Sequence, residues 1–489
     1  MMSITKFMPT RRDRNRPRAP LLAAPLLAAV LLSGCVLAPD HQRPDLPVPD
    51  AWQTPAGAAA PAAGGGAFPQ LADQGWTEFF SDPALQGLIR DALSGNRDLK
   101  ATILSVEAAR AAYGIAGADL WPTVSAGGGG TVTRTPRSAS TQVPPSASVA
   151  RSFSANLAVT SYEIDLFGRV RSLSDRALEH YLASADAAEA ARISLIAEVA
   201  NAYLSLLGDR KLLALATETL ASRQASLSLI DRSFQRGSSS GLDVAQARSA
   251  VEAARAAVSR YQRQVSQDRT ALDLLVGAPV APDRLEGDLD RVRLVTDLPV
   301  GVPSEVLLHR PDISQAEHAL KAAEANIGAA RAAFFPTITL TGSGGFASRE
   351  LGTLFQAGSG AWSFGPSVSV PIFDAGRNLA GLESAKVGRE IAVAQYEKAV
   401  QGAFREVSDA LSSRETLAGQ AKALTDLVEA GQTARRLSQA RYDRGVDSYL
   451  AVLDAERSLF AARQDLVSIE VARLSNLVTL YKVLGGGRG

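Results

Sequence analysis

The chain has 489 residues, enough to bury a large core, with a formal charge of +1 and few aromatic side chains. Without residues 1–34, which have the pattern of a signal peptide, 45 basic and 49 acidic side chains remain; this formal charge of −4 argues against a nucleic-acid partner. All three methionines fall within residues 1–34, and the single cysteine excludes disulfides within the chain. With four scattered histidines, the sequence predicts no metal site and no cofactor.

The N-terminal segment has the organisation of an export signal. Basic residues between positions 6 and 18 precede an apolar stretch, 21–32, that is too short to span a membrane. The stretch ends at Leu32-Ser33-Gly34-Cys35, a pattern typical of bacterial lipoproteins, in which the cysteine is acylated and becomes the mature N-terminus. We therefore predict a lipoprotein signal peptide over 1–34 and lipidation at Cys35. Val36-Leu37 follow in place of the aspartate that would retain the protein in the inner membrane, which favours the outer membrane.

A tether and a helix are predicted next. Residues 35–75 are rich in Pro, Ala and Gly and lack periodicity, which predicts a lipidated tether. Asp82-Pro83 has the pattern of a helix start, with Asp as the cap and Pro in the first turn. The helix is predicted to run to about Asp119, before Trp121-Pro122.

Two β-hairpins are predicted, at about 121–166 and about 336–373. Their strands alternate apolar residues with Ser, Thr and Asn. A soluble sandwich alternates in the same way. Here, however, the polar face carries hardly a charge and long helical segments flank each hairpin, which favours transmembrane hairpins. The clearest apolar positions are Phe153, Ala155, Leu157, Val159, Trp362, Phe364, Val368 and Val370.

Long helical hairpins are predicted at 168–277 and 376–484. Gly237 and Gly445 mark their turns, and Gly168 and Gly376 mark the strand-to-helix junctions, where Asp165 and Asp374 are predicted helix caps. A seven-residue apolar repeat in the first hairpin predicts a coiled coil. Its members are Val199, Leu206, Leu213, Leu220, Leu227 and Phe234.

The chain contains two copies of one unit. Gly168-Arg169 recurs as Gly376-Arg377 and Arg236-Gly237 recurs as Arg444-Gly445, each 208 residues later. We predict repeat 1 at 76–277, a linker at 278–303, repeat 2 at 304–485 and a tail at 486–489. Four strands are too few to close a membrane barrel, and open edges are not tolerated in lipid, so the sequence requires an oligomer.

Two motifs carry a family resemblance over essentially the whole mature chain. One is Arg310-Pro311-Asp312-Ile313 with Phe335-Pro336-Thr337-Ile338, and the other runs from Arg441-Tyr442-Asp443-Arg444-Gly445-Val446-Asp447 to Leu453-Asp454-Ala455-Glu456-Arg457. The chain resembles the TolC-like outer-membrane factors, specifically the lipidated OprM-like (NodT-type) branch. His309 stands where the family often has a second arginine.

The resemblance implies an α+β membrane protein whose homotrimer forms a twelve-stranded β-barrel continued by a periplasmic α-helical barrel. The implied partners are a periplasmic membrane-fusion adaptor, an inner-membrane (RND-type) pump and, through the acyl anchor, outer-membrane lipid. Leu450 and Asp454 match positions that form constricting rings in OprM-like channels, and a ring of like charge selects ions. Tyr442 and Arg457 match positions in bonds that hold the periplasmic tip shut, and Asp447 flanks the same turn.

The predicted function is passive efflux of small molecules, such as drugs and toxic compounds, through an outer-membrane channel. Two alternatives remain: the outer-membrane duct of a type I protein secretion system, and a non-channel periplasmic coiled-coil lipoprotein. An enzyme is not expected, because no nucleophile motif, metal set or cofactor loop is present. Arg310, Pro311 and Asp312 are predicted to be structural.

Overall fold

The computed structural model describes residues 37–50, 52, 75–139, 141, 143–144, 146–294 and 304–486. Cys35, the predicted signal peptide and most of the predicted tether lie outside these residues. The chain forms two compact units. The sheet unit contains Gly117–Leu173 and Asn326–Leu382 with residues 37–39, and the helical unit contains the remaining described residues.

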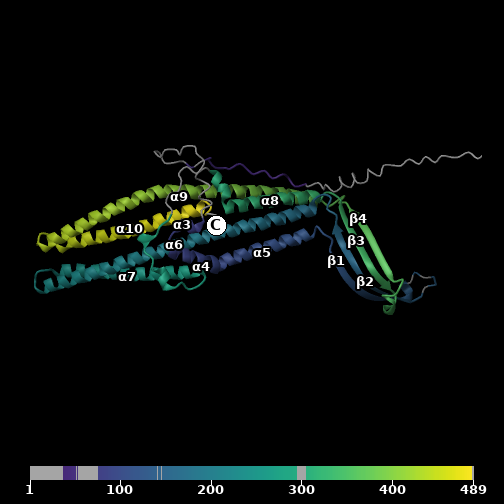
Figure 1. Cartoon of the computed structure of the whole chain (residues 1–489), viewed down its shortest axis with the longest axis horizontal. Helices are drawn as coiled ribbons and strands as arrows, with labels where there is room; N and C mark the ends of the chain where they lie inside the picture. The colour runs from purple at the N-terminus through teal and green to yellow at the C-terminus, as the bar shows by residue number, and fades with distance from the viewer. Residues whose placement is uncertain are drawn as a thin grey trace, which may run out of the picture. The chain divides into compact units, whose positions relative to one another are not determined.

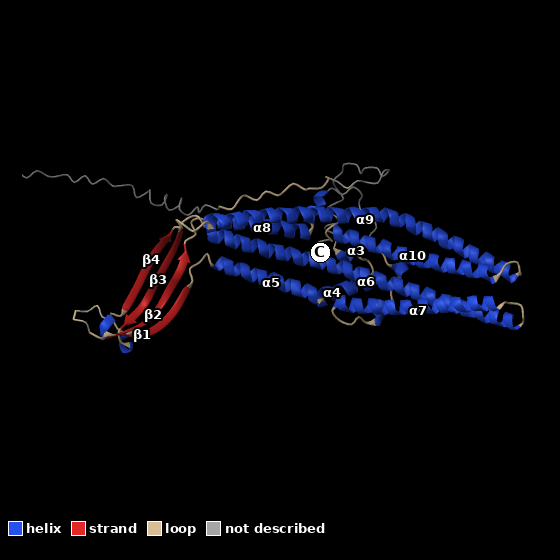
Figure 2. Ribbon diagram, turned by 180° about the vertical axis from the view of Figure 1, so that it is seen from behind, coloured by secondary structure: helices blue, strands red, loops and turns tan. Residues whose placement is uncertain are grey.

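The sheet unit holds four antiparallel strands: β1 (Val124–Thr135), β2 (Ser148–Glu163), β3 (Thr337–Ser348) and β4 (Gly360–Ser369). They lie in the order β1-β2-β3-β4, so the two predicted hairpins join through β2 and β3 into one sheet (Figures 1 and 2). Among the described residues, β1 and β4 each have a partner strand on one side only.

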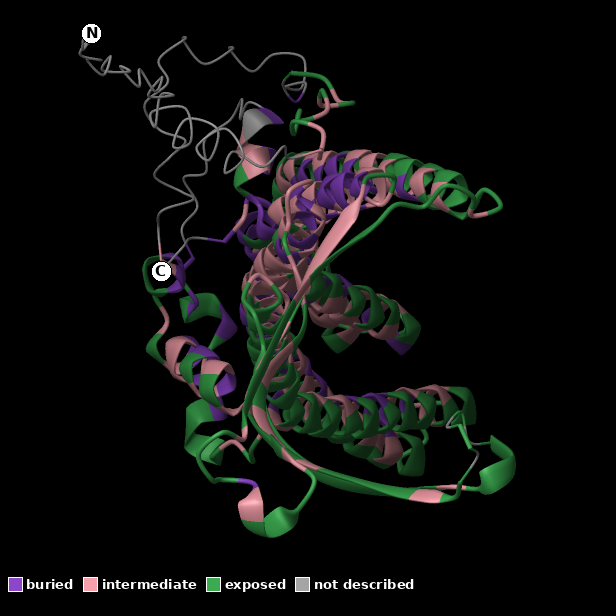
Figure 3. Cartoon of the chain, turned by 90° about the vertical axis from the view of Figure 1, so that its right-hand side faces the viewer, coloured by how far each residue is buried: buried purple, intermediate pink, exposed green. Residues whose placement is uncertain are grey.

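The register separates an apolar face from a polar one. Gly344 of β3 lies opposite both Leu157 and Trp362, which places these two side chains on the same face. Most strand residues are exposed (Figure 3), and the Trp362 side chain is 83% exposed. A Cβ added to Gly130 would lie 2.8 Å from Cδ1 of Phe153, its cross-strand partner. The glycines of β1 therefore leave room for the aromatic ring on β2.

Long helices make up most of the helical unit. The longest described helices are α6 (Arg169–Gln235) and α9 (Arg377–Asp443). Each has 67 residues, and α9 begins 208 positions after α6. α5 (Arg97–Ala118) and α8 (Pro311–Ala332) both have 22 residues. These equal lengths reproduce the sequence repeat. The other α-helices among the described residues are α3 (Trp76–Phe79), α4 (Pro83–Gly95), α7 (Gly241–Val276) and α10 (Tyr449–Val483).

The single helix predicted from Pro83 to about Asp119 is wrong, because the chain breaks at Asn96 into α4 and α5. The Oδ1 of Asn96 accepts a hydrogen bond from the backbone N–H of Leu99, which caps α5, and its Nδ2 donates to the carbonyl of Leu275. Asn96 thus links the break to the C-terminal turn of α7. The apolar periodicity of the sequence does not reveal this break, because the contact that stabilises it is made with a distant segment, α7.

The core of the helical unit gathers around aromatic side chains. The ring of Tyr481 on α10 packs against Phe79 at 4.8 Å and Phe80 at 5.4 Å. Of the predicted heptad positions in α6, Val199 and Leu206 are fully buried, whereas Phe234 near the turn is exposed.

One stretch of α6 is long and apolar enough to cross a membrane, but 56% of it is buried. Core packing explains its composition.

Candidate functional site

The turns of the two helical hairpins form the first part of the candidate site. Gly445 follows α9 with φ +70°, and Gly237 follows α6 with φ +78°, so each turn uses the left-handed conformation that glycine tolerates. A small cluster of buried side chains joins the two hairpins near these turns. It consists of Ile230, Ala247, Tyr449 and Val452.

The two predicted residues beside the second turn have partners within the chain. The ring of Tyr442 packs on Tyr449 with 5.3 Å between centroids. Asp447 accepts two hydrogen bonds from the guanidinium of Arg441, and these lower the pKa of the Asp447 carboxyl. Both side chains of this pair are solvent-accessible, so the pair shapes the turn more than it stabilises the fold.

The three other predicted gate residues lie on α10. The Leu450 side chain is 45% exposed. The Nη2 of Arg457 donates to Oδ1 of Asp454 at 2.8 Å, and these side chains are 77% and 53% exposed. In the described part of the chain, Arg457 bonds within its own helix and makes no polar contact with Tyr442. The bonds across helices that the resemblance implies are therefore not made within one chain.

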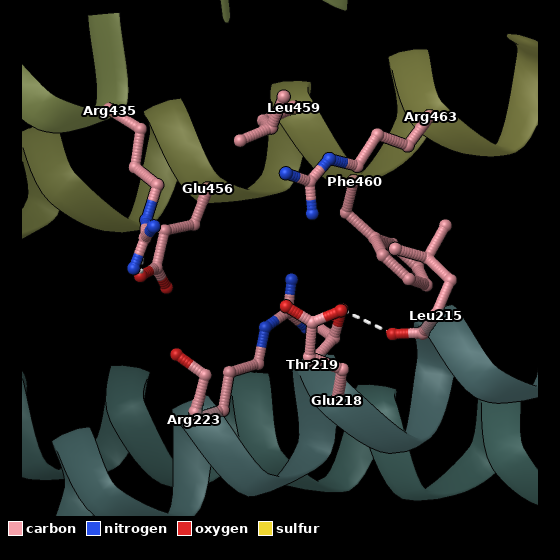
Figure 4. Close-up of a pocket in the computed structure, with 10 residues that line it drawn as sticks. Leu215, Glu218, Thr219, Arg223, Arg435, Glu456, Leu459, Phe460 and Arg463 are labelled. Atoms are coloured by element: carbon pink, nitrogen blue, oxygen red, sulfur yellow. Dashed lines mark hydrogen bonds and ion pairs between the residues drawn. The ribbon is translucent and has the colours of Figure 1, made fainter. Parts of the chain in front are cut away.

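A cavity between the two helical hairpins was not predicted from the sequence (Figure 4). Arg223 of α6 is buried there: its Nη1 donates to the carbonyl of Ala250 and its guanidinium lies 5.7 Å from the ring centroid of Phe460. Burial lowers the pKa of Arg223. Across the cavity, Nε of Arg435 lies 3.5 Å from a carboxylate oxygen of Glu456. Periodicity could not reveal this site, because its residues come from α6, α9 and α10.

The structural motif places one arginine at a helix junction. Arg310 is 7% exposed, and its Nη1 donates to the carbonyl of Val483 near the end of α10. Its other nitrogens bind the carboxylates of Asp312 and Glu406. Pro311 is the first residue of α8. The motif therefore joins the start of α8 to the end of α10 and to α9.

The strand-to-helix junctions have the geometry expected of caps. Gly168 and Gly376 have φ +75° and +85°. The Asp165 carboxylate accepts from the N–H of Arg171. The Asp374 carboxylate accepts from the N–H groups of Gly376 and Asn378, and these bonds lower the pKa of Asp374. No group of three or more His, Cys, Asp or Glu side chains arranged for a metal occurs among the described residues.

Comparison with known proteins agrees with this architecture. A family described as "Outer membrane efflux protein" matches residues 88–278 and 302–486. The "Probable efflux pump outer membrane protein TtgC" of Pseudomonas putida is 47% identical over 453 residues, which cover 92% of each chain. The "Outer membrane protein OprJ" of Pseudomonas aeruginosa is 45% identical over 450 residues, again 92% of each chain.

Solved structures show the same fold. A membrane protein from Pseudomonas aeruginosa is 44% identical with a TM-score of 0.86, covering 93% of this chain and 98% of that one. The open-state outer membrane channel MtrE of Neisseria gonorrhoeae is 40% identical with a TM-score of 0.82, at the same coverage. The predicted TolC-like fold and outer-membrane location are confirmed. The chain belongs to the outer membrane efflux protein family, a family of channels.

Proposed function

We propose that three copies of this chain form the outer-membrane channel of a tripartite efflux system. The channel passively conducts small toxic compounds that a periplasmic adaptor and an inner-membrane, RND-type pump deliver to it. The observation that carries this proposal is the family match along nearly the whole chain, with relatives named for antibiotic, toluene and solvent efflux.

The open edges of the sheet support the trimer. In lipid, each unpaired backbone N–H or C=O costs several kcal/mol. Within the described sheet, β1 and β4 are the edges, so a spanning sheet needs β1 of one copy to pair with β4 of the next. Three copies would supply twelve strands, an even number within the range of closed barrels. Acylation of Cys35 would add a second attachment to the same membrane.

A constriction at the hairpin turns follows from three-fold symmetry. Leu450 and Asp454 are one helical turn apart on α10, so both can face a common axis. Three copies would then stack an apolar ring on a ring of carboxylates, which favours cations over anions. In repeat 1, Gln246 stands at the position equivalent to Asp454. The charge therefore belongs to one hairpin only, and the two hairpins are not equivalent at the gate.

Complementation tests the function. The chain is expressed, with its adaptor and pump, in a Gram-negative host that lacks its own outer-membrane efflux channel. We expect a several-fold rise in the minimal inhibitory concentration of apolar drugs, together with a heat-modifiable trimer in the outer membrane. Secretion of a reporter protein carrying a type I signal, with unchanged drug susceptibility, would instead assign the chain to protein export. Cys35→Ser serves as a control, because the barrel alone should still insert.

A further inference from the structure

We propose that Arg134 and Arg151 form a binding site for the phosphate groups of an outer-leaflet lipid. Arg134 lies near the end of β1 and Arg151 near the start of β2, so the site lies at the end of the sheet that carries the two hairpin loops (Figure 1). This inference rests on the proposed insertion of the sheet as a membrane barrel. It concerns the lipid side of that barrel and not the conduit.

The strand register brings the two arginines together. Arg134 of β1 lies opposite Val149 of β2, and Val132 lies opposite Arg151. Arg134 and Arg151 are therefore diagonal neighbours on one face, with Cβ atoms about 7–8 Å apart or less. That spacing allows two guanidinium groups to bind one phosphate or two adjacent ones.

The face they share is the apolar face. Val124 and Val132 precede Arg134 at even spacing on β1, and Phe153 and Leu157 follow Arg151 at even spacing on β2. The opposite face carries only Ser, Thr, Asn, Ala and Gly at the described register positions of β1 and β2. Charged side chains on a lipid-facing surface are costly near the bilayer centre and tolerated close to its borders.

Strand geometry places the arginines at such a border. Arg134 stands ten positions after Val124, which is about 33 Å along a strand and about 25 Å along the membrane normal at a tilt of about 40°. The apolar band of outer-membrane barrels is also about 25 Å tall. At the opposite border, Trp121 and Phe373 are exposed, as expected of an aromatic girdle. The arginine tips therefore reach the level of the lipid headgroups.

Both guanidinium groups are available for a ligand. Arg134 and Arg151 are exposed and form no ion pair or side-chain hydrogen bond with any residue that the structure describes. Glu350, which follows β3 on the neighbouring loop, pairs with neither of them. Two unpaired arginines beside an apolar surface match a ligand that combines phosphate with acyl chains, because guanidinium binds phosphate in a bidentate manner.

The test compares lipid binding by purified full-length trimers. Fluorescent rough lipopolysaccharide and its dephosphorylated form are titrated against the wild type and Arg134→Gln/Arg151→Gln. We expect the double variant to bind the phosphorylated lipid about tenfold more weakly or worse, and both proteins to bind the dephosphorylated lipid equally. Arg134→Lys/Arg151→Lys should fall between them, because lysine keeps the charge but loses bidentate bonding. Millimolar inorganic phosphate should not compete, since it lacks acyl chains.

Arg137→Gln/Arg349→Gln removes the same charge from the loops and should bind like the wild type. The proposal is overturned if Arg134→Gln/Arg151→Gln binds the phosphorylated lipid as tightly as the wild type. It is also overturned if the loop control loses as much affinity as this variant, because that result would indicate general charge attraction. Efflux complementation by the same variants separates the two claims. If Arg134→Gln/Arg151→Gln restores efflux fully and binds the lipid as the wild type does, only the lipid site is refuted. If the wild type itself fails to restore efflux, the proposed function is refuted.

Discussion

At the residue scale, a few buried polar side chains connect segments that are far apart in the sequence. The guanidinium of Arg310 bonds to Val483, 173 positions away. The carboxyl groups of Asp209 on α6 and Asp268 on α7 interact electrostatically, and Oδ2 of Asp268 is buried without a hydrogen-bond partner in the described structure. A buried polar group is costly when it lacks a partner, so substitutions at these residues should change the stability of the helical unit.

Arg310→Ala should destabilise the protein by about 1–3 kcal/mol, because it leaves the carbonyl of Val483 buried and unpaired. Asp312→Ala should cost less, since the Asp312 side chain is 43% exposed. Thermal unfolding of the trimer, followed by circular dichroism, measures both. Arg255→Ala is the control, because Arg255 pairs with Glu252 on the surface of α7 and should change little. A larger loss for Asp312→Ala than for Arg310→Ala would contradict this ranking.

The carboxyl pair predicts a dependence of stability on pH. Burial and the neighbouring Asp209 raise the pKa of Asp268 to about 7, so the folded protein retains a proton that the unfolded chain releases near its ordinary value of 3.8. Stability should therefore fall as pH rises from about 4 to about 7. Asp268→Asn should flatten this decline and raise the thermal midpoint at pH 7.5. The exposed Asp409→Asn is the control, and a wild-type decline that persists in Asp268→Asn would assign it to other groups.

At the element scale, the ends of helices decide how the hairpins pack. Gly277 ends α7 with φ +79°, and a Cβ there would lie 2.2 Å from the carbonyl oxygen of Gly95. Gly237 ends the turn after α6 with φ +78°, but nothing lies within 4 Å of its Cβ position. The two glycines therefore share a backbone conformation and differ in their surroundings.

This pair separates backbone strain from steric contact. Gly237→Ala should cost about 1–2 kcal/mol, from the left-handed conformation alone. Gly277→Ala should cost about 1–3 kcal/mol more, because α4 and α7 must move apart. Denaturant or thermal unfolding of the two variants gives the comparison. Equal losses would show that the contact between the ends of α4 and α7 relaxes freely.

At the scale of the whole molecule, the roles proposed for the edges of the sheet and the turns of the hairpins depend on the trimer. Within the part of one chain that the structure describes, β1 and β4 each keep one open edge. Likewise, a single Asp454 is an ordinary exposed carboxylate paired with Arg457. In the proposed trimer, three-fold symmetry would convert the edges into barrel seams and the carboxylates into a charged ring.

The proposed gate predicts changes in conductance and in ion selectivity. Asp454→Ala should reduce cation preference because it removes the ring of charge, and Arg457→Ala should raise conductance because it releases carboxylates that repel one another. Single-channel recordings in planar bilayers measure both. Asp426→Ala, which removes one carboxylate from the exposed surface of α9, is the charge-matched control. Unchanged conductance and selectivity in Asp454→Ala/Arg457→Ala would place the constriction elsewhere.

The local features of this protein could be predicted from its sequence. The turns at Gly237 and Gly445, the caps at Asp165 and Asp374 and the alternation along the strands depend on short-range preferences. The 208-residue repeat is visible when the sequence is compared with itself. A residue's conformation at these positions is set by neighbours within a few positions, so pattern and composition suffice. The two motifs around Arg310 and Tyr442 are likewise short stretches of sequence, and they alone indicate the family.

The long-range features required the tertiary structure. Pairing of β2 with β3 joined the two hairpins into one sheet, and the register placed Arg134 beside Arg151 on the apolar face. The break at Asn96, the carboxyl pair of Asp209 and Asp268 and the burial of Arg223 likewise depend on helices that meet only after folding. The sequence does not show whether a polar side chain will face solvent or bond to a distant carbonyl, because only the tertiary packing decides between the two.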